Sequence, residues 1–204
     1  MPSLYLYVLR LIYMSNNIFT IQNSIFKGNI MKKFASVLLV SALLVSLSVN
    51  AANVLKVKES VEINAPAAKV WGLAGEFGNL GAIHPAVAKV EIVEGTNNVK
   101  GAKRILTLQD GGTVNETLTA FNAKKTMMSY FITGGVLPVS DYTATLKVIP
   151  MGKSKSKVVW NAAFKRADQA TTPAESKDDA AATKTITGVF SGGLDNLKKL
   201  AETN

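Results

Sequence analysis

The chain has 204 residues, 23 of them basic and 14 acidic, with one histidine and no cysteine. Without cysteine, the protein can form no disulfide bond, cannot bind a metal through thiolates and cannot use a thiol as a catalytic nucleophile. The formal net charge is +9, but the lysines are scattered apart from Lys153, Lys155 and Lys157, so the sequence has no basic stripe of the kind that binds nucleic acid.

Residues 1–30 show no steady helical or strand periodicity, although they are rich in Ile, Asn, Tyr and Leu. Lys27 and Gly28 lie shortly before Met31, and codons for Lys-Gly can spell a purine-rich ribosome-binding sequence. We therefore expect translation to begin at Met31, which makes residues 1–30 an upstream extension that is not part of the protein. The alternative is a genuine extension that precedes the export signal.

The segment that begins at Met31 has the features of a secretory signal. Lys32 and Lys33 form a basic start, an apolar run covers residues 34–49, and small residues lead up to Ala51. This run of sixteen residues is shorter than the roughly 20 that a membrane-spanning helix needs. We expect residues 31–51 to be a signal peptide cleaved after Ala51, with export to the periplasm and no membrane span left; an uncleaved anchor is the alternative.

The mature chain, residues 52–204, has the length of one domain. Removing four of the 23 basic residues and no acidic residue leaves 19 basic against 14 acidic residues, a net charge of +5. Val alternating with Lys and Glu predicts a strand over residues 54–63. Pro66 suits the first position of a helix, which ends at residues 78–81, before a short irregular segment with His84. The expected buried side of that helix carries Val70, Trp71, Ala74 and Phe77.

Six further alternating segments predict strands, separated by glycine-rich turns. They cover residues 87–93, 103–109, 113–121, 126–133, 141–149 and 157–166. Asp110-Gly111-Gly112 is the clearest hairpin turn. We therefore expect an α+β fold in which a curved, mostly antiparallel sheet of about seven strands grips one long C-terminal helix and encloses a cavity.

The C-terminal helix is expected to begin at Pro173 and to present an apolar stripe that includes Phe190. Gly188, Gly192 and Gly193 lie on or beside that stripe, although each glycine inside a helix costs roughly 1 kcal/mol relative to alanine. Either the helix kinks at these glycines, or a ligand or the sheet approaches it closely there.

Side-chain alternation places two charges in apolar rows. Arg104, Leu106 and Leu108 share one face of their strand, and Val114, Glu116 and Leu118 share one face of the partner strand. Because a lone buried charge is costly, Arg104 and Glu116 are expected to pair. The functional interpretation is a polar anchor in an apolar cavity, with Arg104 for a carboxylate or carbonyl and Glu116 for an amine, a hydroxyl or a proton. The alternative is an internal ion pair.

His84 is the only histidine and lies in a loop, where it can act in acid–base chemistry near neutral pH or be an ordinary loop side chain. Tyr130 and Tyr142 lie on predicted strands and can present hydroxyls to a cavity or pack in the core. The sequence contains no metal-ligand cluster, no phosphate-binding glycine motif and no nucleophile elbow, so we expect no metal and no cofactor.

Residues 63–71, Ile-Asn-Ala-Pro-Ala-Ala-Lys-Val-Trp, resemble the opening of the polyketide cyclase/dehydrase branch of the START-like, or Bet v 1-like, SRPBCC superfamily. Residues 101–104 and 110–118 resemble the central hairpin of that branch, and residues 137–138 and 158–160 continue the likeness. The resemblance covers nearly all of the mature chain and implies a helix-grip fold around a ligand cavity.

The resemblance also implies which residues line that cavity. In similar proteins an Arg and a Glu at the places of Arg104 and Glu116, and a Tyr at the place of Tyr142, lie at or near the pocket, for chemistry in some members and for binding in others. The catalytic candidates are Glu116, Arg104 and His84. The expected ligand-binding set is Arg104, Leu106, Leu108, Val114, Glu116, Leu118, Tyr130, Tyr142 and Phe190.

Three functions remain open at this point. The first is a periplasmic binding or carrier protein for a small hydrophobic or amphipathic molecule, lipid- or polyketide-like, that Arg104 and Glu116 orient. The second is a cyclase or dehydratase with Glu116 as base, Arg104 stabilising an oxyanion and Tyr142 or His84 assisting. The third, by analogy of fold and compartment, is an accessory protein whose partner is a periplasmic dehydrogenase of the methanol-oxidation type.

Overall fold

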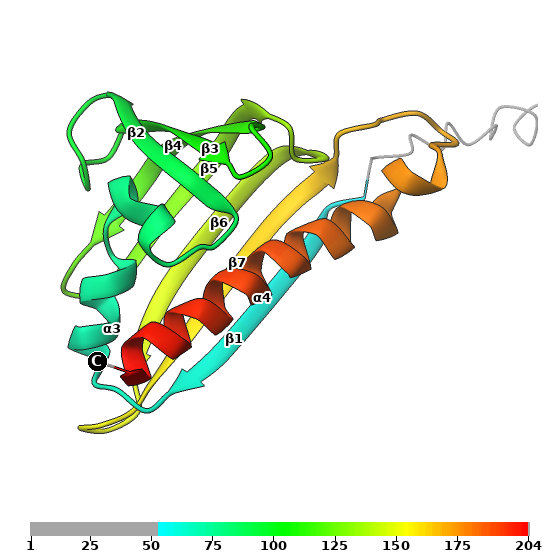
Figure 1. The fold of residues 1–204 in the computed structure, drawn as a ribbon. Helices are drawn as coiled ribbons and strands as arrows, with labels where there is room; N and C mark the ends of the chain where they lie inside the picture. Colours follow the sequence, from blue (N-terminus) through cyan, green and yellow to red (C-terminus); the bar gives the residue numbers. More distant parts are fainter. Residues whose placement is uncertain (1–52, 204) are drawn as a thin grey trace, which may run out of the picture. The chain divides into compact units, whose positions relative to one another are not determined.

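An antiparallel sheet of seven strands forms the body of residues 53–203, the part of the chain described by the computed structural model (Figure 1). The strands are β1 (Leu55–Ile63), β2 (Val87–Glu94), β3 (Lys103–Leu108), β4 (Thr113–Asn122), β5 (Met127–Gly135), β6 (Val139–Pro150) and β7 (Ser156–Arg166). Their order across the sheet is β1-β7-β6-β5-β4-β3-β2. The expected α+β class and the seven strands are confirmed, with boundaries within two residues of those predicted.

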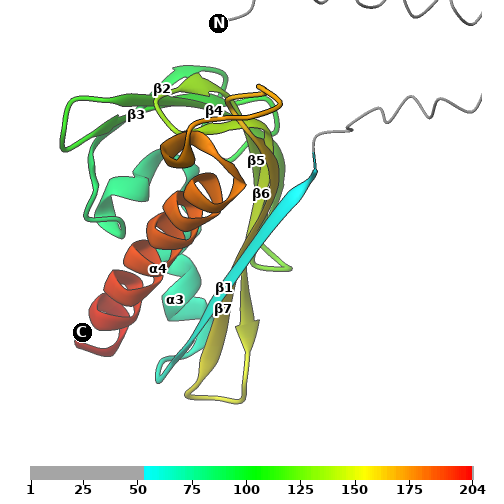
Figure 2. The same cartoon turned by 90° about the vertical axis from the view of Figure 1, so that its right-hand side faces the viewer.

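The helices lie on one face of this curved sheet. The long C-terminal helix α4 (Asp179–Thr203) runs along β1, and α3 (Ala67–Ala74) contacts α4 near its far end (Figures 1 and 2). The 3-10 helix η1 (Phe77–Ala82) packs against β2, and the short η2 (Glu175–Lys177) precedes α4. This is the helix-grip arrangement that the sequence predicts.

The core between the sheet and the helices is mainly apolar. Its largest fully buried side chains include Trp160, Phe77, Phe164 and Phe190. Burying one side chain of this kind stabilises the fold by about 1.5–3 kcal/mol relative to leaving it in water. Four polar or charged residues are buried among the described residues, namely His84, Arg104, Glu116 and Ser156. His84 and Glu116 line one cavity, described below, and Arg104 pairs with Glu116 behind its wall.

The first predicted helix ends earlier than expected. α3 is complete before Glu76, which adopts an extended conformation, and η1 begins at Phe77. Asn97 and Asn98 explain the break, because their Oδ1 atoms accept hydrogen bonds from the backbone N–H groups of Gly78 and Phe77 at 2.8 and 2.9 Å. The apolar residues at helical spacing therefore pack against the core as predicted, but they lie on two separate helices, α3 and η1.

The C-terminal helix begins at Asp179 and not at Pro173. Asp178 Oδ1 accepts a hydrogen bond from the Ala181 N–H at 2.8 Å, which is how an N-cap residue satisfies the free donors of a first helical turn. Residues 173–178 form a loop with η2 in front of that cap. The capping aspartate, and not the proline, decides where this helix starts.

Of the three glycines in α4, only Gly193 lies close to side chains from other elements. The helix is continuous through all three positions, so the kink that we considered does not occur. A Cβ atom at Gly193 would lie 2.9 Å from both His84 Cδ2 and Trp160 Cζ3, whereas at Gly188 or Gly192 it would meet nothing within 4 Å. The close approach of neighbouring side chains is thus confirmed at Gly193 alone.

Residues 1–30 and the expected signal peptide, residues 31–51, lie outside the described part of the chain. Three expectations therefore stay predictions: the start of translation at Met31, the cleavage after Ala51 and the export to the periplasm. Among residues 53–203, no helix is both long enough and apolar enough to cross a membrane.

Candidate functional site

Arg104 and Glu116 form a buried ion pair on neighbouring strands. They stand directly opposite each other in the β3–β4 register. Arg104 Nε donates a hydrogen bond to Glu116 Oε2 at 2.7 Å, and Arg104 Nη2 lies 2.5 Å from the same oxygen. The side chains are only 1% and 6% exposed. The pairing that side-chain alternation predicted is confirmed.

Aromatic rings and a backbone carbonyl hold the guanidinium from its other sides. Arg104 Nη1 donates to the carbonyl oxygen of Phe77, at the start of η1. Arg104 Cζ lies 4.1 Å from the centre of the Phe77 ring and 5.3 Å from that of Tyr130, both within the range of cation–π attraction. Arg104 is therefore engaged within the protein, which leaves it poorly placed to bind a ligand carboxylate.

In contrast to Arg104, Glu116 has one oxygen that accepts no hydrogen bond from the described residues. Both guanidinium contacts go to Oε2, and no hydrogen bond among the described residues reaches Oε1. Burial raises the pKa of Glu116, and the charge and hydrogen bonds of Arg104 act in the opposite direction. Oε1 can therefore accept a hydrogen bond from a ligand hydroxyl or ammonium group, or take up a proton.

Two tyrosines and a tryptophan continue this buried polar group. Trp160 Nε1 donates a hydrogen bond to the Tyr130 hydroxyl at 2.9 Å, and the Tyr130 and Tyr142 ring centres lie 6.5 Å apart. Burial raises the pKa of Tyr130, and the pKa of Tyr142 is raised by burial and by its neighbours Tyr130 and Glu116. Both hydroxyls therefore stay protonated near neutral pH and can donate hydrogen bonds.

An internal cavity of about 80 Å³ lies between the sheet, the loop after η1 and α4. Most of its lining is apolar, and Glu116 contributes the acidic group. The lining residues are Leu80, His84, Ala86, Val87, Leu106, Leu108, Val114, Glu116, Tyr130, Ile132, Leu137, Tyr142, Trp160, Val189 and Phe190. This is a mainly apolar space with a few convergent polar groups, the usual character of a small-molecule site.

Two of the expected ligand-binding residues do not line this cavity. Arg104 lies behind Glu116, where Phe77 and Tyr130 enclose it, and its part is to hold the carboxylate in place. Leu118 is fully buried two positions further along β4 and pairs with Tyr130 in the sheet. The other seven predicted residues face the cavity, and their contact with a ligand stays a prediction.

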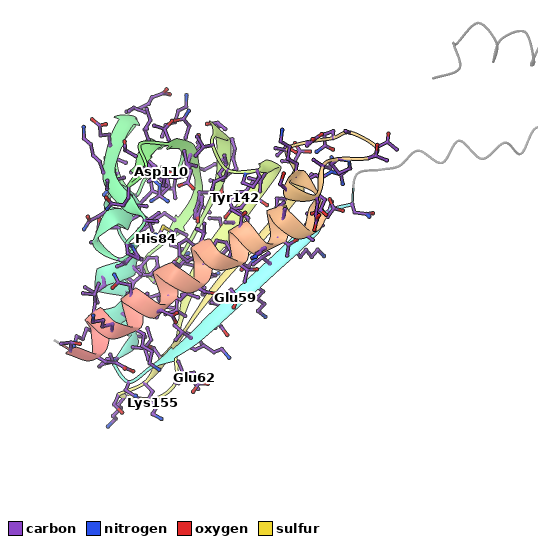
Figure 3. All side chains as sticks on the ribbon, turned by 45° about the vertical axis from the view of Figure 1, so that its right-hand side comes forward. Glu59, Glu62, His84, Asp110, Tyr142 and Lys155 are labelled. Carbon is purple, nitrogen blue, oxygen red and sulfur yellow. The ribbon has the colours of Figure 1, made fainter. Side chains whose placement is uncertain are left out.

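His84 lies on the loop after η1, and its side chain reaches α4 (Figure 3). Its Nε2 donates a hydrogen bond to the Val189 carbonyl at 2.9 Å, and its Nδ1 accepts one from the Ala86 N–H at 3.2 Å. Because both nitrogens are engaged and burial lowers the pKa of His84, the ring is a neutral bridge. This geometry does not support the catalytic expectation for His84.

Several cavity residues were not among the predicted set. Ile132 stands two positions after Tyr130 on β5, and both line the cavity, so the alternation that pointed to Tyr130 could also have found Ile132. Leu137 comes from the β5–β6 loop, and Trp160 was assigned to the core alone. Residues 53–203 also contain no group of three or more His, Cys, Asp or Glu side chains placed to hold a metal ion.

Comparison with known proteins places this geometry in a family. Residues 54–202 match the family described as polyketide cyclase/dehydrase and lipid transport. The chain resembles the protein XoxI from Bacillus cereus, with 28% identity, a TM-score of 0.63, and 72% of this chain and 94% of XoxI covered.

More distant structures share the fold. The Zhui aromatase/cyclase from Streptomyces sp. R1128 is 16% identical with a TM-score of 0.58, covering 74% of this chain and 94% of the other. Ara h 8.0201 is 19% identical with a TM-score of 0.60, covering 74% and 100%. The chain therefore belongs to the polyketide cyclase/dehydrase and lipid transport family, and its described residues have the Bet v 1-like helix-grip fold.

Proposed function

We propose that this protein is a periplasmic binding or carrier protein for a small hydrophobic or amphipathic molecule. The observation that carries the proposal is a mainly apolar cavity in which one carboxylate oxygen, Glu116 Oε1, accepts no hydrogen bond from any of residues 53–203. Apolar contacts supply affinity in such a site, and a few polar groups fix the orientation of the ligand. The family description, which includes lipid transport, supports the same class of ligand.

The polar groups of the cavity restrict the chemistry of the ligand. Glu116 offers a hydrogen-bond acceptor with negative charge, so a hydroxyl or an ammonium group is favoured over a carboxylate. Tyr142 supplies a neutral hydroxyl that can donate a hydrogen bond to the oxygen of a ligand hydroxyl group. We therefore propose a ligand with one hydroxyl or amine end and an apolar body.

Native mass spectrometry of the protein purified from the periplasm, expressed from Met31, tests the proposal. A small molecule released on denaturation and a mature chain that begins at Ala52 are the expected results. The double variant Arg104→Met with Glu116→Leu, which removes the acceptor without leaving an unpaired buried charge, should reduce the amount of bound molecule, whereas Glu94→Leu, at an exposed site on β2, should not. A bare protein mass in every gentle preparation would contradict the carrier role.

A cyclase or dehydratase using the same cavity is the second candidate. The observation in its favour is a carboxyl group of raised pKa beside two tyrosines that stay protonated, since such a set can take a proton and hydrogen-bond a carbonyl oxygen. In this scheme Glu116 is the base, and Tyr142 replaces Arg104 as the group facing the substrate oxygen.

The Glu116→Gln variant separates these two functions. A carrier should keep most of its ligand affinity, because the glutamine oxygen still accepts a hydrogen bond. An enzyme should keep affinity but lose turnover of the released molecule, measured by mass change over time. Activity of a partner dehydrogenase that responds to the protein but to no cavity substitution would instead favour the accessory role.

A further inference from the structure

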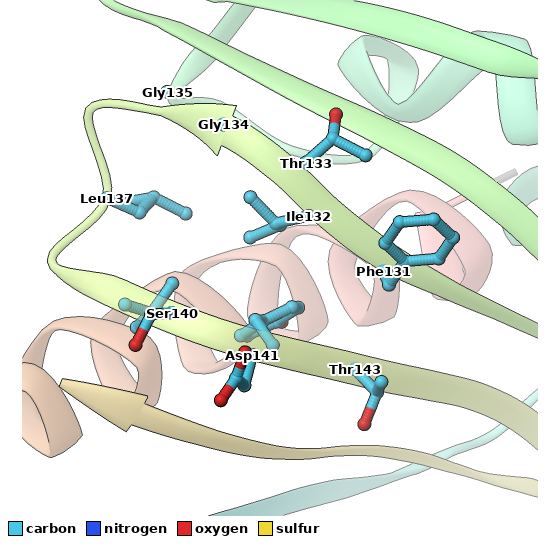
Figure 4. Close-up of a pocket in the computed structure, with 11 residues that line it drawn as sticks. Phe131, Ile132, Thr133, Gly134, Gly135, Leu137, Ser140, Asp141 and Thr143 are labelled. Atoms are coloured by element: carbon cyan, nitrogen blue, oxygen red, sulfur yellow. The ribbon is translucent and has the colours of Figure 1, made fainter. Parts of the chain in front are cut away.

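Strands β5 and β6 are hydrogen-bonded to each other over only part of their length. These two strands pair from Met127↔Lys147 to Phe131↔Thr143, and the pairing then stops. Beyond this point β5 continues as far as Gly135 along β4, while Val139 and Ser140 of β6 stay paired with β7. The two strands thus diverge over their last residues, as Figure 4 shows.

Local backbone features keep the strands apart. The β6–β7 register shifts between Ser140 and Thr143, and Asp141 within this bulge has a φ of +49°, which is unusual for a residue other than glycine. The backbone pairing of Val139 and Ser140 with β7 keeps this part of β6 on the β7 side, and the largely exposed Asp141 carboxylate lies 2.8 Å from the Lys165 ammonium group of β7. The separation is therefore part of the folded backbone.

A surface groove of about 720 Å³ occupies the space between the diverging strands. Ile132 and Leu137 point into it from β5 and from the β5–β6 loop (Figure 4). Polar side chains of Thr133, Ser140 and Thr143 lie along its sides. The groove therefore offers an apolar centre with polar edges.

The groove and the internal cavity share part of their walls. Ile132, Leu137 and Tyr142 line both spaces. Leu137 lies on a three-residue connection between the strands, so a rotation of its side chain does not require the sheet to move. The cavity alone holds about 80 Å³, well below the roughly 300 Å³ at which ligand pockets usually begin.

We propose that the ligand binds across this shared wall, with a hydroxyl or ammonium head in the cavity at Glu116 and a longer apolar tail in the groove between β5 and β6. This inference rests on the proposed function and specifies its ligand as a linear molecule with one polar end. The small cavity fits a head of a few atoms, and the larger groove fits the tail.

The ligand class can be tested with three probes that share a ten-carbon chain. Isothermal titration calorimetry below the micelle concentration should detect binding of 1-decanol and decylammonium, and decanoate should bind at least about tenfold more weakly, about 1.4 kcal/mol. Glu116→Gln should weaken decylammonium more than 1-decanol. Equal binding of all three probes would overturn the assignment of Glu116 as the site of the head group.

The groove can be blocked at a single site because the chain contains no cysteine. Thr143 lies on the groove at the last β5–β6 pair, and Thr145 lies two pairs away on the same strand and outside the groove. Labelling Thr143→Cys with pyrene maleimide should weaken 1-decanol binding at least about tenfold, whereas labelled Thr145→Cys should bind like wild type. Thr133→Cys, on the opposite rim, provides a second block if Thr143→Cys does not fold.

The outcomes separate this inference from the proposed function. If labelled Thr143→Cys and Thr133→Cys bind 1-decanol as well as labelled Thr145→Cys does, the groove is not the site of the tail. An internal carrier site would then remain possible. If the wild type binds none of the three probes, the proposal of a linear ligand with one polar end is wrong. The carrier role itself is decided by whether the periplasmic protein releases a small molecule.

Discussion

Glu116 and His84 are two buried polar residues on the wall of the same cavity, and they differ in what they leave unused. His84 donates to Val189 and accepts from Ala86, so neither ring nitrogen is free. Glu116 receives both contacts of Arg104 on Oε2 and keeps Oε1 for the cavity. Burial of a polar residue therefore does not identify a functional group, whereas an acceptor that remains after its protein partners are counted does.

The largest expected effect comes from removing the cation that holds Glu116. Arg104→Met leaves a buried carboxyl group without a partner, which typically costs about 3–5 kcal/mol of unfolding free energy. Urea denaturation followed by circular dichroism measures the loss. Adding Glu116→Leu to Arg104→Met should recover much of it, because no uncompensated charge then remains.

Lys103 provides the matched control for that experiment. It precedes Arg104 on β3 and forms an ion pair of 2.6 Å with Glu94, but both side chains are about half exposed, at 48% and 63%. Exposed pairs contribute about 0–1 kcal/mol, so Lys103→Met should be nearly silent. If Arg104→Met cost no more than Lys103→Met, the distinction between a buried anchor and a surface pair would fail.

Gly193 tests the His84 side of the comparison. In Gly193→Ala, the new methyl group would meet His84 and Trp160 at 2.9 Å, so we expect a loss of about 1–3 kcal/mol from overpacking. Gly192→Ala meets nothing within 4 Å and should stabilise the helix by about 0.5–1 kcal/mol. Thermal unfolding of the two adjacent variants should therefore shift in opposite directions, and a shared direction would contradict the close packing.

Sequence reasoning located the polar pair because strand alternation and the Asp110-Gly111-Gly112 turn fix which face each residue occupies. Alternation does not say where a long side chain ends, so the burial of Arg104 behind Glu116 could not be predicted. That position depends on the Phe77 carbonyl, which a 3-10 helix brings across from another part of the chain.

Other features escaped prediction for similar reasons. The division between β5 and β6 depends on a positive φ at Asp141 and on register with β7, and neither leaves a periodic signal in the sequence. Leu137 reaches the cavity from a loop, where periodicity gives no direction. The start of α4 was misplaced because Pro173 also suits a first helical turn, and only the hydrogen bond of Asp178 decides between them.

Glu116 and His84 should also affect stability in opposite directions as pH changes. Burial raises the pKa of Glu116 above 4.5 in the folded protein. The contribution of this shift to the free energy of unfolding is therefore fully present below pH 4.5 and is lost as pH rises through the folded pKa. Unfolding free energies of wild type and Glu116→Gln, measured across this range, should differ in slope. Equal slopes would mean that burial and Arg104 balance each other at Glu116.

The smallest effect is expected from His84, and its sign is the reverse. The pKa of His84 is lowered below 6.5, so its contribution is fully present above pH 6.5 and is lost as pH falls through the folded pKa. Because His84 is the only histidine, its ring signals in NMR spectra are unambiguous, and their titration midpoint should lie below 6.5. A midpoint at or above 6.5 would mean that the ring accepts a proton despite its two hydrogen bonds, and His84 would then regain a claim to acid–base chemistry.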